Sequence, residues 1–350
     1  MYNERITTRR GYNTFIVSLI LILMLLTLLS FNIGRFSRIE ITNIPKILLY
    51  QICPVFEKTW TTVDEKVVLT LRLPRIIAAI MVGASLAVSG AAYQALFSNP
   101  IASSDSLGVS SSAAFGAVLG FLLNLGIVLV KSISFIVGCI SVISVYIIAS
   151  KINNRKNLTV FLILIGMVFS SLFGALLSIL KYIADPIDQL PKITYWLMGS
   201  ISNVRLTEIP FSLALFAVGL LPILMLRWRL NLLSLSDVEA KSIGENITLL
   251  RFITIICATL LTSSAVAMTG GISWVGLVIP HIARLIVGND ARKLIPASAL
   301  LGAIFLLAMD DLSRSLTVYE LPISILTSLF GAPIFFIILI WRRKQIVDEN

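Results

Sequence analysis

The sequence predicts an all-α protein that crosses a membrane about ten times. Three observations indicate this class: 57% of the 350 residues are hydrophobic, 13% are charged, and the mean hydropathy is +0.95. A soluble domain needs roughly 25–35% charged residues on its water-facing surface. Lipid must therefore surround most of this chain, and we interpret residues 1–350 as a single transmembrane domain.

Ten uncharged apolar runs are candidate spans, since a helix of about 20 apolar residues crosses the hydrocarbon core. They cover approximately residues 14–33, 76–98, 107–130, 132–150, 158–182, 207–227, 249–269, 272–287, 294–312 and 321–341. The first run is longer than the apolar core of a secretory signal, and residues 30–34 offer no small-x-small cleavage pattern. We expect this run to remain as the first helix.

Lys and Arg in the short connections predict the orientation. If the amino terminus is inside, the inner segments collect most basic residues, around 1–13, 151–156, 227–241, 284–293 and 342–350. The outer connections, such as the one that holds Lys131, carry fewer. The segment 34–75 is also basic, but long loops are translocated largely regardless of charge. Both termini, 1–13 and 342–350, are therefore predicted to be cytoplasmic, and 34–75 is predicted to be an external loop.

Composition and motifs argue against several functions. The net charge of +10 is spread in ones to threes between apolar runs, which does not indicate nucleic-acid binding. Cys53, Cys139 and Cys257 are far apart without a CxxC, and His281 is the single histidine, so neither a cofactor nor a metal site is predicted. The acidic pair at Asp310 and Asp311 has no second acidic cluster to complete an enzymatic metal site.

The source of energy is also constrained by the sequence. Mid-membrane ionisable residues are typical of ion-coupled carriers, yet the candidates here, such as His281, Arg284 and Asp310, lie at the span edges. An ion-coupled carrier is therefore the less favoured alternative. The sequence has no GxxxxGK[ST] motif, so ATP-driven movement would need a separate motor subunit.

Small residues in two runs predict close helix contacts. Gly83, Ala87, Gly90 and Gln94 share one face of the second run, and residues 116–120 form a GxxxG pattern in the third. Small side chains let helix backbones approach each other inside a bundle. Packing alone explains these positions, and Gln94 fits either a bond between helices or a contact with cargo.

Several motifs, in one order along the chain, resemble a known family. They are Leu-Arg-Leu-Pro-Arg at 71–75, Val-Gly-Ala-Ser-Leu-Ala-Val-Ser-Gly at 82–90, Gln-Ala-Leu-Phe-Ser-Asn-Pro-Ile-Ala at 94–102, Asn-Leu-Leu-Ser-Leu at 231–235, Gly-Leu-Val-Ile-Pro-His-Ile-Ala-Arg at 276–284, Glu-Leu-Pro-Ile at 320–323 and Gly-Ala-Pro at 331–333. Together they resemble the FecCD family, the permeases of type II ABC importers for iron-siderophore complexes, haem and vitamin B12.

The resemblance implies the type II importer permease fold, with ten helices per subunit and both termini in the cytoplasm of a bacterial cell. It also implies three kinds of partner: a second permease subunit, identical or related, two ATP-binding cassette subunits below, and a solute-binding protein outside. The expected cargo is a ferric siderophore or another iron chelate, with haem, corrinoid or molybdate as alternatives. The permease would be a transport subunit and not itself an enzyme.

The resemblance further assigns roles to residues of this sequence. Arg72, Arg75 and Arg314 match arginines that dock the binding protein. The segment 229–247 matches the part that couples to the ATPase, with Asn231, Leu232, Leu233, Leu235, Ser236, Glu239 and Gly244 as its expected contacts. Asn99, Pro100, Ile101 and Thr159 match the cytoplasmic gate.

Overall fold

The computed structural model describes residues 8–34, 39–40, 42–51, 53, 58–152, 158–234, 244–317 and 319–348, and the described part is helical without a strand. Among the described residues, eight helices are long and apolar enough to cross a membrane, and two more are apolar but shorter. These helices correspond one to one, in order, to the ten predicted spans. The predicted all-α, polytopic class is therefore confirmed.

The long crossing helices are α2 (Arg9–Ser30), α5 (Leu73–Leu96), α7 (Ile127–Ile152), α8 (Leu158–Ile183), α10 (Ile209–Leu226), α12 (Ile247–Thr269), α14 (Ala291–Ser315) and α15 (Ile323–Asp348), and the short ones are α6 (Val109–Leu122) and α13 (Val275–Val287). The connections contain α3 (Asn43–Tyr50), α4 (Thr62–Lys66), η1 (Val67–Arg72), η2 (Ser104–Leu107), α9 (Gln189–Leu197), η3 (Leu206–Glu208) and η4 (Arg229–Ser234).

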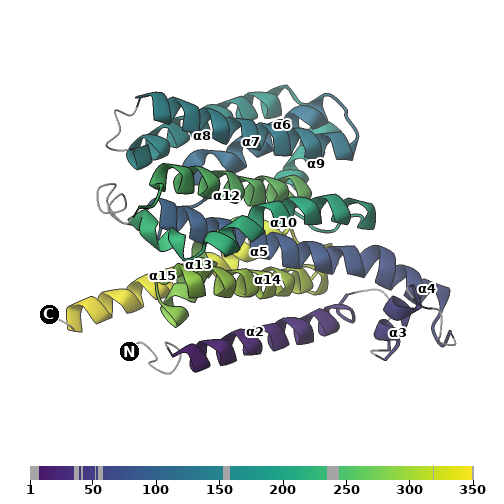
Figure 1. Ribbon diagram of the computed structural model, residues 1–350. Helices are drawn as coiled ribbons and strands as arrows, with labels where there is room; N and C mark the ends of the chain where they lie inside the picture. Colours follow the sequence, from purple (N-terminus) through teal and green to yellow (C-terminus); the bar gives the residue numbers. More distant parts are fainter. Residues whose placement is uncertain are drawn as a thin grey trace.

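Helix α5 occupies the centre of the bundle. It lies between the α6–α9 group and the group of α13, α14 and α15 (Figure 1). In its most apolar 18-residue stretch 89% of the residues are buried, against 11% in that of α8. Its small residues explain this position, because Gly83, Ala87 and Gly90 leave room for neighbouring backbones. The predicted helix-contact face of this run is confirmed.

Two glycine pairs show how close the approach is. A Cβ on Gly83 would lie 2.2 Å from the carbonyl oxygen of Gly302 on α14, and one on Gly90 would lie 1.9 Å from that of Gly276 on α13. The GxxxG of α6 also lies against α7, since a Cβ on Gly116 would lie 2.9 Å from the Ile133 carbonyl oxygen. Any larger residue at Gly83 or Gly90 would force backbones apart.

Helix boundaries differ from the predicted ones in two places. α4, the π-helical η1 and α5 form one 35-residue helix, Thr62–Leu96, so the end of the predicted 34–75 loop is helical. This helix is about 52 Å long and exceeds a hydrocarbon core of about 30 Å. Lys131 was predicted to lie in a connection, but it lies in α7, where its Nζ is 2.5 Å from Glu208 Oε2. That ion pair lets the helix include a charged residue.

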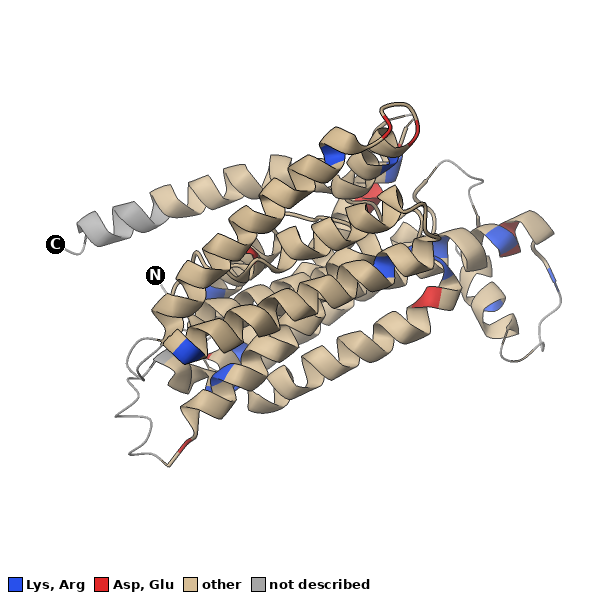
Figure 2. Ribbon diagram, turned by 90° about the horizontal axis from the view of Figure 1, so that it is seen from above, with Lys and Arg blue, Asp and Glu red and all other residues tan. Residues whose placement is uncertain are grey.

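Charged residues gather toward the two ends of the bundle (Figure 2). One end contains α3, α4 and the start of the long helix, and the opposite end contains the start of α2 and the end of α15 (Figure 1). Following the predicted orientation, we call the first the outer end and the second the inner end.

Candidate functional site

Three arginines and three carboxylates form a cluster at the outer end, here called the outer ion cluster. Its members are Arg72, Arg75, Asp310, Asp311, Arg314 and Glu320. The three arginine residues are buried, with Arg72 4%, Arg75 8% and Arg314 6% exposed. Arg72, Arg75, Arg314 and Glu320 line one cavity of about 290 Å³. The structure thus brings the three predicted docking arginines together.

Arg75 is held by two carboxylates. Its Nε donates to both oxygens of Asp310 at 2.8 and 2.9 Å, and its Nη1 donates to both oxygens of Glu320 at 2.8 and 2.9 Å. Charge-assisted bonds with paired oxygens are both strong and directional. Because Asp310 is on α14 and Glu320 precedes α15, Arg75 fastens the outer part of α5 to both elements.

Arg314 fastens a third element to the cluster. Its Nη2 donates to the Ser30 carbonyl oxygen at 2.8 Å, and it also contacts Ser30 Oγ and Asp311 Oδ1. Ser30 Oγ in turn donates to Asp311 Oδ1 at 2.7 Å. The end of α2 is therefore tied to the outer end of α14, which explains how a charged residue is accommodated in this buried position.

The charges of the outer ion cluster cancel, because three arginines face three carboxylates. The side chain of Asp310 is 0% exposed and that of Glu320 is 43% exposed. Glu320 is thus the carboxylate that an external group can most easily replace.

A second cavity, of about 590 Å³, lies at the inner end and is here called the inner cavity. Its lining includes Asn99 and Pro100 from the turn after α5, Asn231 from η4, and Asp290 at the start of α14. Asn99 Oδ1 accepts the Ile101 N–H at 3.0 Å, which fixes this turn. The structure therefore places the predicted gate turn and the first part of the predicted coupling segment on one cavity. Of the other two predicted gate residues, neither Ile101 in the same turn nor Thr159 at the start of α8 is among the residues that line it.

Asn231 joins η4 to the start of α14. Its Nδ2 donates to Asp290 Oδ1 at 2.9 Å, and its Oδ1 accepts the Ala291 N–H at 2.8 Å. Leu230 and Leu233 are buried beside it and anchor η4 in the bundle core. Of the other predicted coupling residues, Leu232 is half-buried in η4, and Gly244 has φ +81°. Leu235, Ser236 and Glu239 lie outside the described residues.

Asp290 is the N-cap of α14 and was not predicted from the sequence. Its carboxylate also accepts the Arg292 N–H at 3.0 Å and the Arg292 side chain at 3.0 Å. Burial opposes ionisation of Asp290, but bonds from Arg292 and Asn231 outweigh it and hold the pKa below its ordinary value of 3.8. The signal for this cap was present, since Asp before an apolar periodic run is a common helix start.

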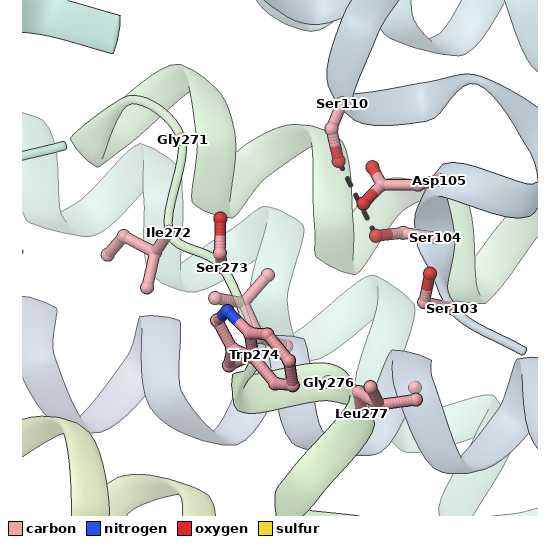
Figure 3. A pocket seen from close by; sticks show the side chains of 12 residues that line it. Ser103, Ser104, Asp105, Ser110, Gly271, Ile272, Ser273, Trp274, Gly276 and Leu277 are labelled. Carbon is pink, nitrogen blue, oxygen red and sulfur yellow. Dashed lines mark hydrogen bonds between the residues drawn. The ribbon is translucent and has the colours of Figure 1, made fainter. Parts of the chain in front are cut away.

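A third cavity, of about 250 Å³, lies beside Leu86 and Gly90 in the carboxyl-terminal half of α5. Figure 3 shows Ser103, Ser104, Asp105 and Ser110 on one side of it and Ser273 and Trp274 on the other. We call it the serine-lined cavity. The described residues that line it offer hydroxyl groups and one carboxylate, and they include no Lys or Arg. These residues were not predicted from the sequence, because Ser is common in loops and helices of every kind.

Trp274 adopts an uncommon backbone conformation at the edge of this cavity. Its φ is 71°, which is the left-handed region that bulky residues avoid. The side chain packs against α15, where a Cβ on Gly331 would lie 2.7 Å from the Trp274 Cβ, and its ring is 6.3 Å from that of Phe335. The position of Trp274 is thus fixed by two contacts with α15.

Metal-binding chemistry has little support in the described residues. Within them, no group of three or more His, Cys, Asp or Glu side chains is arranged to hold a metal ion. His281 lies edge-on to Phe335, with ring centres 5.6 Å apart.

The apolar crossing helices, with cavities at the outer and the inner end of the bundle, are typical of a multi-pass membrane transport protein. The chain belongs to the FecCD transport family, whose sequence profile matches residues 21–342. The predicted family is confirmed, and the chain is a permease of the ABC importer class.

Individual relatives agree on this class but differ in cargo. The molybdate import system permease protein MolB of Haemophilus influenzae is 38% identical over 337 residues, which cover 96% of this chain and 97% of that protein. A Helicobacter pylori protein named "Probable iron chelatin transport system permease protein" is 37% identical, over 80% of this chain and 84% of its own length. A solved ABC transporter of the metal-chelate type, in an inward-facing conformation, is 36% identical with a TM-score of 0.83, covering 93% of this chain and 99% of its own.

Proposed function

We propose that this protein is the membrane-spanning subunit of an ATP-driven importer whose cargo is a ferric siderophore or another iron chelate. The observation that supports this most directly is the match to the FecCD transport family over residues 21–342. In this proposal the subunit pairs with a second permease in the cytoplasmic membrane of a bacterium. Two ATP-binding subunits attach at the inner end, and a solute-binding protein delivers cargo at the outer end.

The distribution of charge supports cytoplasmic termini. Lys151, Arg227, Arg229 and Lys293 lie at or near the inner ends of their helices, and Arg9 lies in the first turn of α2 at the same end. Basic residues in short connections are retained on the cytoplasmic side. The inner end would therefore face the cytoplasm.

The inner cavity supports an alternating-access mechanism. The gate turn at Asn99 and Pro100 and the coupling residue Asn231 line the same space. A displacement of η4 by the ATP-binding subunits would therefore change the shape of the cavity through which cargo leaves. The permease itself would make and break no covalent bond.

The serine-lined cavity bears on the cargo. In the part of the chain that the structure describes, its lining has one carboxylate, Asp105, and no basic side chain. A free oxyanion would meet an unfavourable charge there, whereas a neutral or cationic iron chelate would find hydroxyl partners. This arrangement favours an iron chelate such as a ferric hydroxamate.

Molybdate is the second candidate cargo. It is favoured by the 38% identity to MolB, which extends over 96% of this chain. Because relatives of similar identity are named for different cargoes, sequence similarity alone does not choose between molybdate and an iron chelate.

The outer ion cluster supports a docking role for Arg72, Arg75 and Arg314, since they line a cavity that opens at the outer end. Carboxylates of a binding protein could reach these guanidinium groups where Glu320 is displaced. Such bonds are directional yet weakened by salt, which suits reversible docking.

The experiment is uptake into proteoliposomes that contain the permease with its ATP-binding subunits, and a cargo-loaded binding protein on the outer side. We expect radiolabelled ferrichrome to accumulate only with ATP inside and with a hydrolysis-competent ATPase. A matched control omits the ATPase and imposes a proton or sodium gradient. Accumulation under the gradient alone would refute an ATP-driven importer, and uptake of molybdate without ferrichrome would establish the second cargo.

A further inference from the structure

The contact between η4 and α14 suggests how movement at the inner end reaches the rest of the bundle. Asn231 and Asp290 are 59 residues apart in the chain, yet two hydrogen bonds of 2.9 and 2.8 Å join Asn231 to Asp290 and to the Ala291 N–H. Both bonds use the side-chain amide of Asn231, one as donor and one as acceptor. This amide therefore fits the start of α14 in one orientation only.

The rest of α14 is well placed to transmit a displacement of its start. The helix is continuous over 25 residues, about 37 Å, and its other end contains Asp310, Asp311 and Arg314 of the outer ion cluster. In the middle, Gly302 contacts Gly83 backbone to backbone, which leaves no compressible side chain between α14 and α5. A displacement of α14 that reaches Gly302 would therefore be passed to α5.

We propose that Asp290 is the positioning residue that receives the movement of the coupling segment, through its bond to Asn231, and passes it along α14 to α5. This inference rests on the proposed function, because it presumes that ATP-binding subunits displace η4. The alternative is that the two bonds only cap α14 and hold the η4 connection in place. The two readings differ in whether breaking the pair changes the amount of ATP hydrolysed per cargo imported, and whether exchanging the partners restores it.

A reciprocal exchange is the sharpest test. Asn231→Asp would place two carboxylates against each other and remove the donated bond. The double variant N231D/D290N restores one amide and one carboxylate. The carboxylate introduced at position 231 could then accept both the Ala291 N–H and the new amide, and Asn is as good an N-cap as Asp. Uptake of radiolabelled ferrichrome or molybdate, whichever the wild-type complex accumulates, is compared with ATP hydrolysis in the same vesicles.

We expect N231D to raise the ATP hydrolysed per cargo imported by about tenfold, since loss of a charged hydrogen bond changes an equilibrium by that order. The exchanged pair should return the ratio to within about threefold of wild type. Asn13→Asp, an exposed position in the first turns of α2, makes the same charge change at the inner end and should not alter the ratio. Should N231D fold poorly, Asn231→Ala removes the donated and the accepted bond without adding charge and should raise the ratio at least as much.

A cargo-independent measurement separates this inference from the proposed function. Spin labels at Ser98 and Asn289, both exposed on the inner cavity, report its width. ATP binding should change this distance in wild type and in the exchanged pair but not in N231D. If N231D kept the wild-type ratio of ATP hydrolysed to cargo imported, and if ATP still changed its Ser98–Asn289 distance, the proposed role of Asp290 would be overturned. Absence of any ATP effect in the wild-type complex would instead contradict the proposed function.

Discussion

Gly83 of α5 and Gly302 of α14 meet backbone to backbone. A Cβ on Gly83 would lie 2.2 Å from the Gly302 carbonyl oxygen, and a Cβ on Gly302 would lie 2.3 Å from the Gly83 carbonyl oxygen. Because the obstructing atoms are backbone, the two helices could accept a methyl group only by moving apart. This contact joins the central helix to the helix that spans both ends of the molecule.

Gly302→Ala should therefore destabilise the protein by about 1–3 kcal/mol or more, the usual cost of overpacking. The measurement is thermal unfolding in detergent. Gly174→Ala on α8 is the matched control, because nothing lies within 4 Å of its added Cβ. Equal melting temperatures for the two variants would contradict the close contact.

Asp310→Asn should destabilise the folded protein strongly, although Asp and Asn are nearly equal in size. It would leave the buried Arg75 with Glu320 as its remaining carboxylate partner, and breaking a buried pair costs about 3–5 kcal/mol. We expect a lower yield of folded protein and a lower melting temperature. Glu320→Gln removes the exposed partner of the same arginine and should cost below about 1 kcal/mol. A larger loss in E320Q than in D310N would reverse the roles given to the two carboxylates.

Glu320→Gln should also strengthen docking of the binding protein. In E320Q, Arg75 no longer binds the Glu320 carboxylate, so a carboxylate of the binding protein can bind Arg75 without displacing it. We therefore expect up to about tenfold tighter binding at low salt. Binding to the permease in nanodiscs, measured at two salt concentrations, is the readout. Asp188→Asn neutralises an exposed carboxylate near the same end and serves as the control. Weaker binding in E320Q would mean that Glu320 itself contacts the partner.

The contribution of Asp290 should depend on pH. Its pKa is lowered in the folded protein, so its stabilising effect is present above the unfolded value near 3.8 and is lost as the pH falls through the folded pKa. At neutral pH, Asp290→Asn should lower stability by about 1 kcal/mol. The difference in melting temperature between wild type and D290N should shrink below about pH 4. A difference that grows on acidification would contradict the direction of the shift.

Much of the fold could be predicted because lipid imposes a simple rule. Runs without charge become helices, and the glycines of the second run mark the central helix. Boundaries were harder to predict: Lys131 continues α7 because Glu208, 77 residues later, lies beside it. The extension of α5 back to Thr62 likewise depends on the packing of η1 against α3 rather than on local composition.

The candidate sites were predictable only where a family motif names them. Arg72, Arg75 and Arg314 were found in this way, but their burial and their internal carboxylates were not foreseeable, because Asp310 is 235 residues from Arg75. Asp290 and Asp105 are single polar residues near helix starts, and sequence alone gives no reason to connect them with Asn231 or with Trp274.

Trp274 shows where the choice of residue is not governed by folding alone. A glycine could adopt its φ of 71° without penalty, whereas a tryptophan retains backbone strain on the order of 1–3 kcal/mol. We would expect a glycine at this position unless the tryptophan ring is needed there. The indole beside the serine-lined cavity is therefore a position at which thermal robustness and the shape of that cavity impose opposing demands.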